Sequence, residues 1–285
     1  MKKIIITAIA LLVAGSMAFA QENVYTITSG NVKMTVDAGQ GGKIMSLKYG
    51  DQEVISQFKF PNAFGSTFWT SPQTEWNWPP VPEIDSMPYS VEEKDGHIIM
   101  TSQLGEKIPM RIIKNFSVDP ADGAIVIKYS IVNCSAATRS VAPWEITRVP
   151  NGGVVFFESP VKKIWPAGLM DFKGKAGAAW FQIDQAKENR KTNADGAGWL
   201  AFADNGLLLV KEFDDITVKD PAPGEAEIQV YVNFGKTYVE LESQGAYKAL
   251  EPGENLDWTV RWHLVPFEGE ASPSKALVKK VKALL

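Results

Sequence analysis

Four polar side chains share one face of a predicted strand near the end of the chain. In TYVELESQG, the period-two alternation of a strand sets the valine and leucine on one face. The other face carries Tyr238, Glu240, Glu242 and Gln244. Two carboxylates displayed together can accept hydrogen bonds from hydroxyl groups or exchange protons with them. Because glutamate is usually exposed, a solvated outer face is the alternative to a polar site.

The next predicted strand, NLDWTVRWHLVP, also alternates between apolar and polar residues. Its polar face includes Arg261 and His263. If the two strands pair through the connection YKALEPGE, these two side chains lie near the glutamates of the first strand. They would then form either a cross-strand salt network or the floor of a polar cleft.

A third group of chemically useful residues lies at the end of another predicted strand, SVAPWEITRVP. It contains Trp144, Glu145 and Arg148. An indole face stacks on the apolar side of a pyranose, and charged groups make directional bonds to hydroxyls. The group therefore suits sugar recognition. Alternatively, Trp144 packs in the core and Glu145 pairs with Arg148.

The stretch FGSTFWTSPQTEWNWPPVPEID holds three of the nine tryptophans of the chain. Its prolines restrict the backbone, so the indoles can be held in place before a ligand arrives. We predict a sugar-stacking wall made of Trp69, Gln73, Glu75, Trp76 and Trp78. The alternative is that the same residues plug the cleft.

Several other kinds of site are not supported by the sequence. The only histidines are His97, interpreted as a surface residue, and His263, and no HExxH motif or cysteine cluster occurs. We therefore expect no metal ion and no cofactor. The single cysteine, Cys134, excludes an internal disulfide. A nucleophile elbow and a P-loop are also absent from the sequence.

The first twenty residues have the pattern of a secretory signal peptide. Two lysines precede an apolar stretch over residues 4–14, and a small-x-small site ends at Ala20. We predict cleavage after Ala20, a single mature domain over residues 21–285, and a periplasmic or secreted protein.

The mature chain is acidic. Loss of the two signal-peptide lysines lowers the basic residues from 29 to 27 against 33 acidic ones, a net charge of −6. This charge argues against a nucleic-acid partner. No later stretch reaches the roughly 18 apolar residues of a membrane span. We expect a monomer that binds a mono- or oligosaccharide.

The segments that position these residues are predicted to be strands. Segments with strand-like alternation are separated by turn signals such as YGDQ and ADNG, and no alternation of strands with helices is visible. Besides GAIVIKYSIVN, they lie near 22–29, 31–37, 43–49, 96–102, 108–117, 198–204, 206–213, 225–234, 237–244 and 255–264. One helix is predicted in SKALVKKVKALL, with Ser272 as its cap and Pro273 in its first turn. The sequence thus predicts one large antiparallel, all-β domain with a short C-terminal helix.

Five segments carry a resemblance to a known family. GGKIMSLKYGDQEVI, FWTSPQTEWNWPP, APWEITRVP, GWLAFADNGLLLVKEF and YVELESQGAYKALEPGE resemble the DUF4380 group of galactose mutarotase-like proteins, over roughly residues 22–267. The resemblance implies a β-supersandwich, in which large twisted antiparallel sheets bind carbohydrate on a concave face.

The resemblance also implies roles for particular residues. LESQ looks like the LETQ stretch of aldose 1-epimerases, whose glutamate is the general base, so Glu242 is the candidate base. The histidines that mutarotases use as partners have no counterpart here. Trp144 or Glu145 stands where one is expected, and Glu145 would serve as the acid in a carboxylate pair with Glu242.

Three functions follow as hypotheses. The first is an exported carbohydrate-binding protein without turnover. The second is an aldose 1-epimerase-like enzyme, and the third is an envelope scaffold that uses the tryptophan loop as a protein contact. The candidate catalytic residues are Glu242 and Glu145. The candidate binding residues are Trp69, Gln73, Glu75, Trp76, Trp78, Trp144, Arg148, Glu240 and Gln244.

Overall fold

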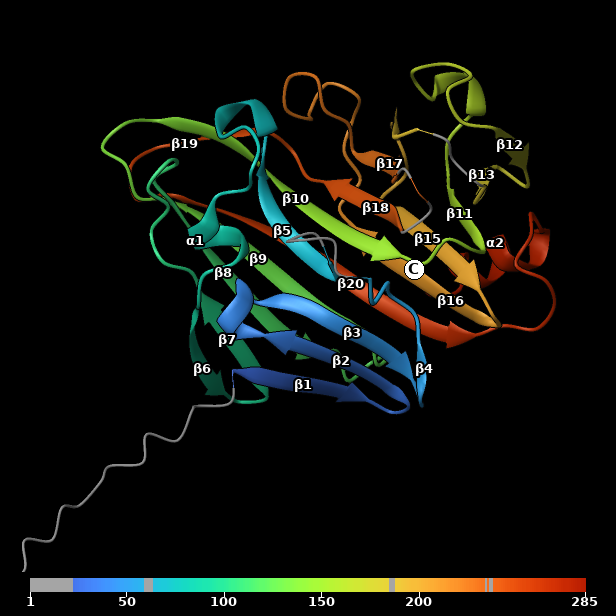
Figure 1. Ribbon diagram of the computed structural model, residues 1–285, viewed down its shortest axis with the longest axis horizontal. Helices are drawn as coiled ribbons and strands as arrows, with labels where there is room; N and C mark the ends of the chain where they lie inside the picture. The colour runs from blue at the N-terminus through green and yellow to red at the C-terminus, as the bar shows by residue number, and fades with distance from the viewer. Residues whose placement is uncertain (1–22, 59–63, 185–187, 234, 236–237) are drawn as a thin grey trace, which may run out of the picture.

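The structure is a computed structural model that describes residues 23–58, 64–184, 188–233, 235 and 238–285. The predicted signal peptide, residues 1–20, lies outside the described residues. The described residues form two ten-stranded antiparallel sheets. Figure 1 shows the two sheets lying one over the other. The prediction of an all-β protein with a short C-terminal helix is confirmed.

The first sheet contains the polar strand that ends in Gln244. Its order is β1-β2-β3-β5-β10-β18-β17-β14, with β4 paired to β3 and β19 paired to β10. The strands are β1 (Val24–Ser29), β2 (Val32–Asp37), β3 (Lys43–Tyr49), β4 (Gln52–Glu53), β5 (Ser66–Ser71), β10 (Arg139–Val149), β14 (Arg190–Ala194), β17 (Ile228–Val232), β18 (Val239–Gln244) and β19 (Lys248–Leu250).

The second sheet packs against the first. Its order is β12-β13-β11-β15-β16-β20-β9-β8-β7-β6. The strands are β6 (Ser90–Lys94), β7 (His97–Thr101), β8 (Met110–Val118), β9 (Ile125–Asn133), β11 (Val154–Phe157), β12 (Phe172–Lys175), β13 (Ala178–Gln182), β15 (Trp199–Asp204), β16 (Leu207–Phe213) and β20 (Asn255–Pro266).

The helices are short. They are η1 (Ala38–Gln40), η2 (Gln73–Glu75), α1 (Pro82–Asp85), η3 (Val161–Lys163) and α2 (Lys275–Lys282). The helix α2 lies beside β15 and β16 in Figure 1. Among the described residues, no helix combines the length and the hydropathy needed to cross a bilayer.

The predicted cap of the C-terminal helix is wrong by two residues. Ser274, not Ser272, precedes the first turn of α2 in an extended conformation, and its hydroxyl accepts from the backbone N–H of Leu277 at 3.2 Å. A serine that bonds the N–H three residues ahead satisfies one of the free donors of the first turn. The helix therefore begins only after Pro273.

The core between the sheets is aromatic and also contains an ion pair. Phe68 of β5 stacks on Tyr129 of β9 with ring centroids 4.1 Å apart. Nearby, the Glu145 carboxylate of β10 lies 2.8 Å from the Lys211 ammonium of β16, and both side chains are fully buried. Because strand side chains alternate, the neighbours of Glu145 on β10 point away from this core. That opposite face carries the candidate site.

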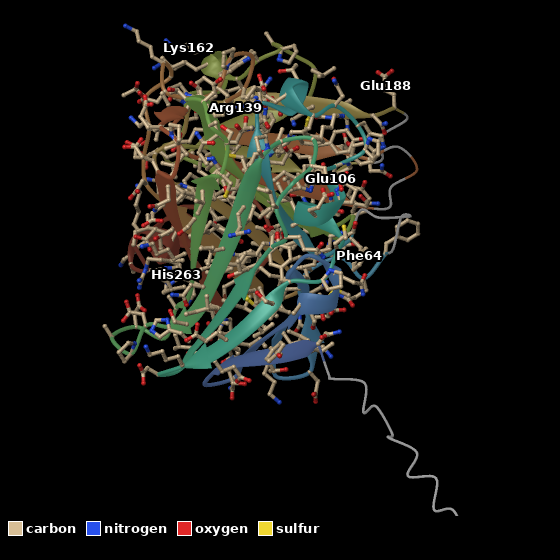
Figure 2. The ribbon with its side chains drawn as sticks, turned by 90° about the vertical axis from the view of Figure 1, so that its left-hand side faces the viewer. Phe64, Glu106, Arg139, Lys162, Glu188 and His263 are labelled. Atoms are coloured by element: carbon tan, nitrogen blue, oxygen red, sulfur yellow. The ribbon has the colours of Figure 1, made fainter. Side chains whose placement is uncertain are left out.

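The two polar strands predicted to pair lie in different sheets. β18 pairs with β10 and β17, whereas β20 pairs with β16 and β9. Arg261 instead forms ion pairs with Asp119 at 2.9 Å and with Asp122 of the β8–β9 turn. Figure 2 shows His263 on the side of the molecule opposite to Phe64, which lies just before β5. The expectation that Arg261 and His263 lie near the glutamates is therefore wrong.

Candidate functional site

A cavity of about 780 Å³ opens on the face of the first sheet that points away from the core. Side chains of β5, β10 and β18 form its floor, and the loop between β5 and α1 forms one wall. Seven of the residues predicted from the sequence line it: Trp69, Gln73, Trp78, Trp144, Arg148, Glu240 and Glu242. Candidate residues from three segments far apart in the chain thus meet in one place.

Only one of the two carboxylate oxygens of Glu242 is hydrogen-bonded by the described residues. Its Oε2 accepts from Trp144 Nε1 at 2.8 Å and from Lys191 Nζ at 2.9 Å. The Lys191 ammonium also lies 4.8 Å from the centre of the Trp144 ring. Glu242 is 1% exposed, and its Oε1 has no hydrogen-bond partner among the described residues. A buried acceptor in this position can take a hydroxyl hydrogen from a ligand.

Glu240 is paired with a buried arginine. Its Oε1 lies 2.8 Å from an Nη of Arg148, whose guanidinium packs over the rings of Trp69 and Tyr238 at 5.9 and 5.6 Å. Burial raises the pKa of Glu240 to about 6 against the opposing charge of Arg148, and the charge of Glu242 adds to the rise. Glu240 can thus be protonated or ionised near neutral pH.

Two tyrosines add hydroxyl groups to the cavity. Burial, reinforced by the charge of Glu240, raises the pKa of Tyr238 to about 12. The same two causes raise the pKa of Tyr231. Both phenols therefore stay protonated and can donate or accept a hydrogen bond.

Tryptophan rings form the aromatic side of the cavity. Trp69 packs edge to face against Trp144, with centroids 5.3 Å apart, and against Trp78, with centroids 6.2 Å apart. Trp76 does not line the cavity, because its indole is buried behind Trp69 and donates from Nε1 to the carbonyl of Thr70 at 2.9 Å. Trp76 thus supports the wall that its neighbours form.

Asp85, at the end of α1, ties the tryptophan loop to the sheet. Its Oδ1 accepts from Trp69 Nε1 at 2.8 Å and from Thr67 Oγ1 at 3.0 Å. Its Oδ2 accepts from Lys43 Nζ at 3.0 Å, and both partners of this ion pair are buried. Three donors therefore fix the position of the carboxylate, which in turn orients the Trp69 indole.

Glu145 lies on the opposite face of β10 from the cavity. Its Oε1 accepts from the Tyr129 hydroxyl at 2.5 Å, and its Oε2 pairs with Lys211. It contacts neither Arg148, the partner expected in the structural alternative, nor Glu242. The proposed carboxylate pair of Glu145 and Glu242 has no geometric basis. In the β10–β18 ladder Glu242 faces Ile146, the residue after Glu145, so the two carboxylates point to opposite faces of the sheet.

Two further candidate residues lie outside the cavity. Gln244 is buried, and its Nε2 donates at 3.0 Å to Glu225 Oε2 and to Gln229 Oε1. Glu75 is exposed on η2. Both residues belong to the surroundings of the cavity rather than to its lining.

The sequence patterns did not identify several of the residues that line the cavity. The most consequential are Asp85, Lys191, Tyr231 and Asn233. Lys191 lies on β14, RKTNA, which shows no apolar alternation and gave no strand signal. Among the described residues, no group of three or more histidine, cysteine, aspartate or glutamate side chains is placed to hold a metal ion.

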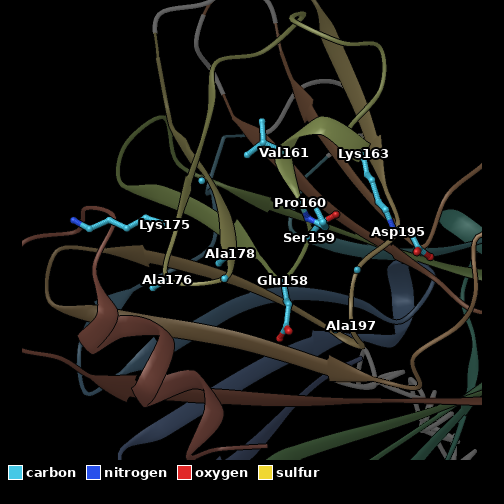
Figure 3. Close-up of a pocket in the computed structure, with 13 residues that line it drawn as sticks. Glu158, Ser159, Pro160, Val161, Lys163, Lys175, Ala176, Ala178, Asp195 and Ala197 are labelled. Carbon is cyan, nitrogen blue, oxygen red and sulfur yellow. The ribbon is translucent and has the colours of Figure 1, made fainter.

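A second cavity, of about 640 Å³, lies between η3, the β12–β13 hairpin and the segment after β14. Figure 3 shows Glu158, Lys163 and Asp195 around it. None of the lining residues drawn there is aromatic, and much of the lining is glycine or alanine. None of the residues singled out in the sequence lies in it, so the cavity over β10 and β18 is the stronger candidate site.

Comparison with known proteins identifies the fold. No family model and no curated protein matches the sequence. Similar solved structures include a galactose mutarotase-like protein from Lactobacillus casei, with a TM-score of 0.62, 12% identity, and coverage of 85% of this chain and 100% of that one.

Two further structures are similar. A proposed aldose 1-epimerase from Escherichia coli K12 has a TM-score of 0.62 and 13% identity, covering 86% of this chain and 99% of that one. A galactose mutarotase-like protein from Clostridium acetobutylicum has a TM-score of 0.55 and 10% identity, covering 85% and 95%. The two packed antiparallel sheets described here thus form a galactose mutarotase-like fold.

Proposed function

We propose that this protein binds a carbohydrate in the cavity over β10 and β18. The observation that carries the proposal is the joint placement of indole rings and a buried, half-satisfied carboxylate, Glu242, in one cavity. Pyranoses present an apolar face that stacks on indole and a rim of hydroxyls that bond to charged groups. The proposed aldose 1-epimerase and the galactose mutarotase-like protein among the structures of similar fold are consistent with this proposal.

The charges around the cavity favour an uncharged ligand. Each acidic side chain in its lining is matched by a basic one. The pairs are Glu240 with Arg148, Glu242 with Lys191, and Asp85 with Lys43. A cavity with matched charges provides hydrogen bonds without requiring a counter-charge on the ligand. A neutral, hydroxyl-rich molecule meets these conditions.

Intrinsic tryptophan fluorescence during titration with a panel of mono- and oligosaccharides tests the proposal. At least one sugar should change the emission saturably, and E242Q should weaken its binding by about tenfold, since the amide loses charge-assisted hydrogen bonds. E75Q is the matched control, because Glu75 is exposed and outside the cavity. An unchanged emission with every sugar would overturn the proposal.

A second function, an aldose 1-epimerase-like activity, is favoured by one observation. The unpartnered Oε1 of Glu242 is placed to accept a proton from an anomeric hydroxyl in the cavity. Glu240, on the same face and with a pKa of about 6, is better placed than Glu145 to return a proton to the ring oxygen as the C1–O5 bond opens. The aldehyde then closes again in either configuration.

Polarimetry of freshly dissolved α-D-glucose or α-D-galactose tests this second function. The protein should shorten the time to anomeric equilibrium, and E242Q and E240Q should each remove the effect. Binding without any acceleration would leave carbohydrate binding as the function.

We further propose that the chain belongs to the DUF4380 group and is exported to the periplasm or the medium. The motifs quoted above and the pattern of residues 1–20 support these proposals. Mass spectrometry of the protein recovered from a periplasmic or culture fraction should give a mature chain that begins at Gln21. An intact Met1 in that fraction would contradict the predicted cleavage.

A further inference from the structure

Trp78 differs from the other tryptophans of its loop in exposure. Its side chain lines the cavity but is 63% exposed, whereas Trp69 and Trp76 are buried. Leaving a large apolar ring in water forgoes the hydrophobic stabilisation that burial would provide. An exposed indole in a cavity wall is therefore available to stack on a ligand.

The indole of Trp78 is held in position despite this exposure. Its edge-to-face contact with Trp69, at an interplanar angle of 79°, covers at most one of its two faces. Pro79 and Pro80 follow it directly and line the same cavity. Just before it, the backbone N–H of Asn77 donates to the carbonyl of Gln73 at 2.7 Å. An ordered ring with a free face loses little conformational entropy when a ligand stacks on it.

The cavity thus has two chemically different ends. Its floor is buried and polar, with Glu242 and Arg148 each 1% exposed. Its mouth is open to solvent and has an apolar part at Trp78 and Pro79. A volume of about 780 Å³ is in the upper part of the range of about 300–1,000 Å³ found for sites that hold drug-sized ligands. A single pyranose, smaller than such a ligand, would leave the mouth unfilled.

We propose that the ligand is an oligosaccharide of at least two rings, whose terminal ring lies on the Glu240–Glu242 floor and whose next ring stacks on Trp78. The inference deepens the proposed function and rests on it. A ring held on the floor can extend through its glycosidic bond toward the mouth, where the free indole face lies. Trp78 is then an outer subsite that selects chain length.

The test compares each monosaccharide with its own trisaccharide. Suitable probe pairs are glucose with cellotriose, glucose with maltotriose, xylose with xylotriose and mannose with mannotriose, titrated calorimetrically. The pair that binds should show a trisaccharide affinity at least tenfold above that of the monosaccharide. W78A should lower the trisaccharide affinity about five- to tenfold more than the monosaccharide affinity.

W165A is the matched control. Trp165 is also exposed, at 38%, and also precedes a proline, but it lines neither cavity. Both affinities should be unchanged in W165A, and circular dichroism should show W78A to be folded. Equal affinities for the two members of every binding pair, or an equal loss of both in W78A, would overturn the outer subsite alone. If no probe binds, the proposed function fails with it.

Discussion

Trp144 and Glu242 are joined across neighbouring strands by a hydrogen bond of 2.8 Å from the indole N–H to a carboxylate oxygen. The bond is diagonal in the ladder, since Glu242 directly faces Ile146 and Trp144 faces Gln244. The bond engages the N–H group of the indole and leaves the other carboxylate oxygen of Glu242, Oε1, available. The aromatic and the anionic parts of the site are therefore positioned by the same contact.

Loss of this contact should destabilise the fold. W144F removes the N–H donor and leaves the buried carboxylate of Glu242 with Lys191 as its remaining partner. We expect the free energy of unfolding, from urea denaturation, to fall by about 1–3 kcal/mol. W165F, at an exposed position, should stay within about 0.5 kcal/mol of the original protein. Similar losses in both variants would show that the bond contributes nothing specific.

The ion pair between the sheets should be strongly coupled. K211M leaves the Glu145 carboxylate buried without a counter-charge, which should lower the free energy of unfolding by about 3–5 kcal/mol. Adding E145Q should recover part of this loss, because the neutral amide needs no counter-charge and its oxygen can still accept from Tyr129. Guanidinium denaturation of the two single variants and the double variant measures the coupling. Additive losses would contradict it.

Asp85 should control the order of the tryptophan loop. D85N keeps an acceptor for Trp69 but removes the negative charge that pairs with the buried Lys43. We expect a loss of about 3–5 kcal/mol in the free energy of unfolding, with a red shift of tryptophan emission as water reaches the loop. E83Q, on the same short helix, should have neither effect. A blue shift or unchanged emission in D85N would refute the role of Asp85 in ordering the loop.

A buried carboxyl outside the site should make stability depend on pH. Burial raises the pKa of Glu227 from 4.5 to about 7, although its oxygens accept from the backbone N–H groups of Gly196 and Gly198. Because the folded state holds this proton more tightly than the unfolded state, the contribution of Glu227 to stability is full below pH 4.5. It is lost progressively as the pH rises to about 7.

The variant E227Q isolates this contribution. Between pH 4.5 and 8 the original protein should lose roughly 3 kcal/mol more of its free energy of unfolding than E227Q does. Urea denaturation at the two pH values measures the difference, and E93Q, at an exposed position of β6, is the control. Parallel pH profiles for the original protein and E227Q would contradict the assignment.

Local alternation predicted part of the cavity lining, and the rest depends on pairing between strands far apart in the sequence. The assignment of Glu240 and Glu242 to one face of a strand is correct, because period two is a local property. The partner strand could not be found this way. β18 pairs with β10, nearly a hundred residues earlier, and not with β20, the long strand that follows it.

The errors on individual residues have physical causes. Glu145 is close to Trp144 and Arg148 in the sequence, but the alternation of side chains along β10 points it into the core. Trp76 lies in the predicted loop, yet packing behind Trp69 removes it from the cavity. Lys191 reaches the site from a strand without apolar alternation, so no sequence pattern could reveal it.

The alternation of side chains along β10 limits which insertions and deletions this strand can accept. Trp144 and Arg148 belong to the cavity, while Glu145 between them belongs to the core. Insertion or deletion of one residue before Trp144 would exchange the two faces, burying the guanidinium between the sheets and turning the core carboxylate outward. Length variation in this strand is therefore tolerable only in steps of two residues or beyond its paired part, because a shift of one residue would move the cavity face into the core.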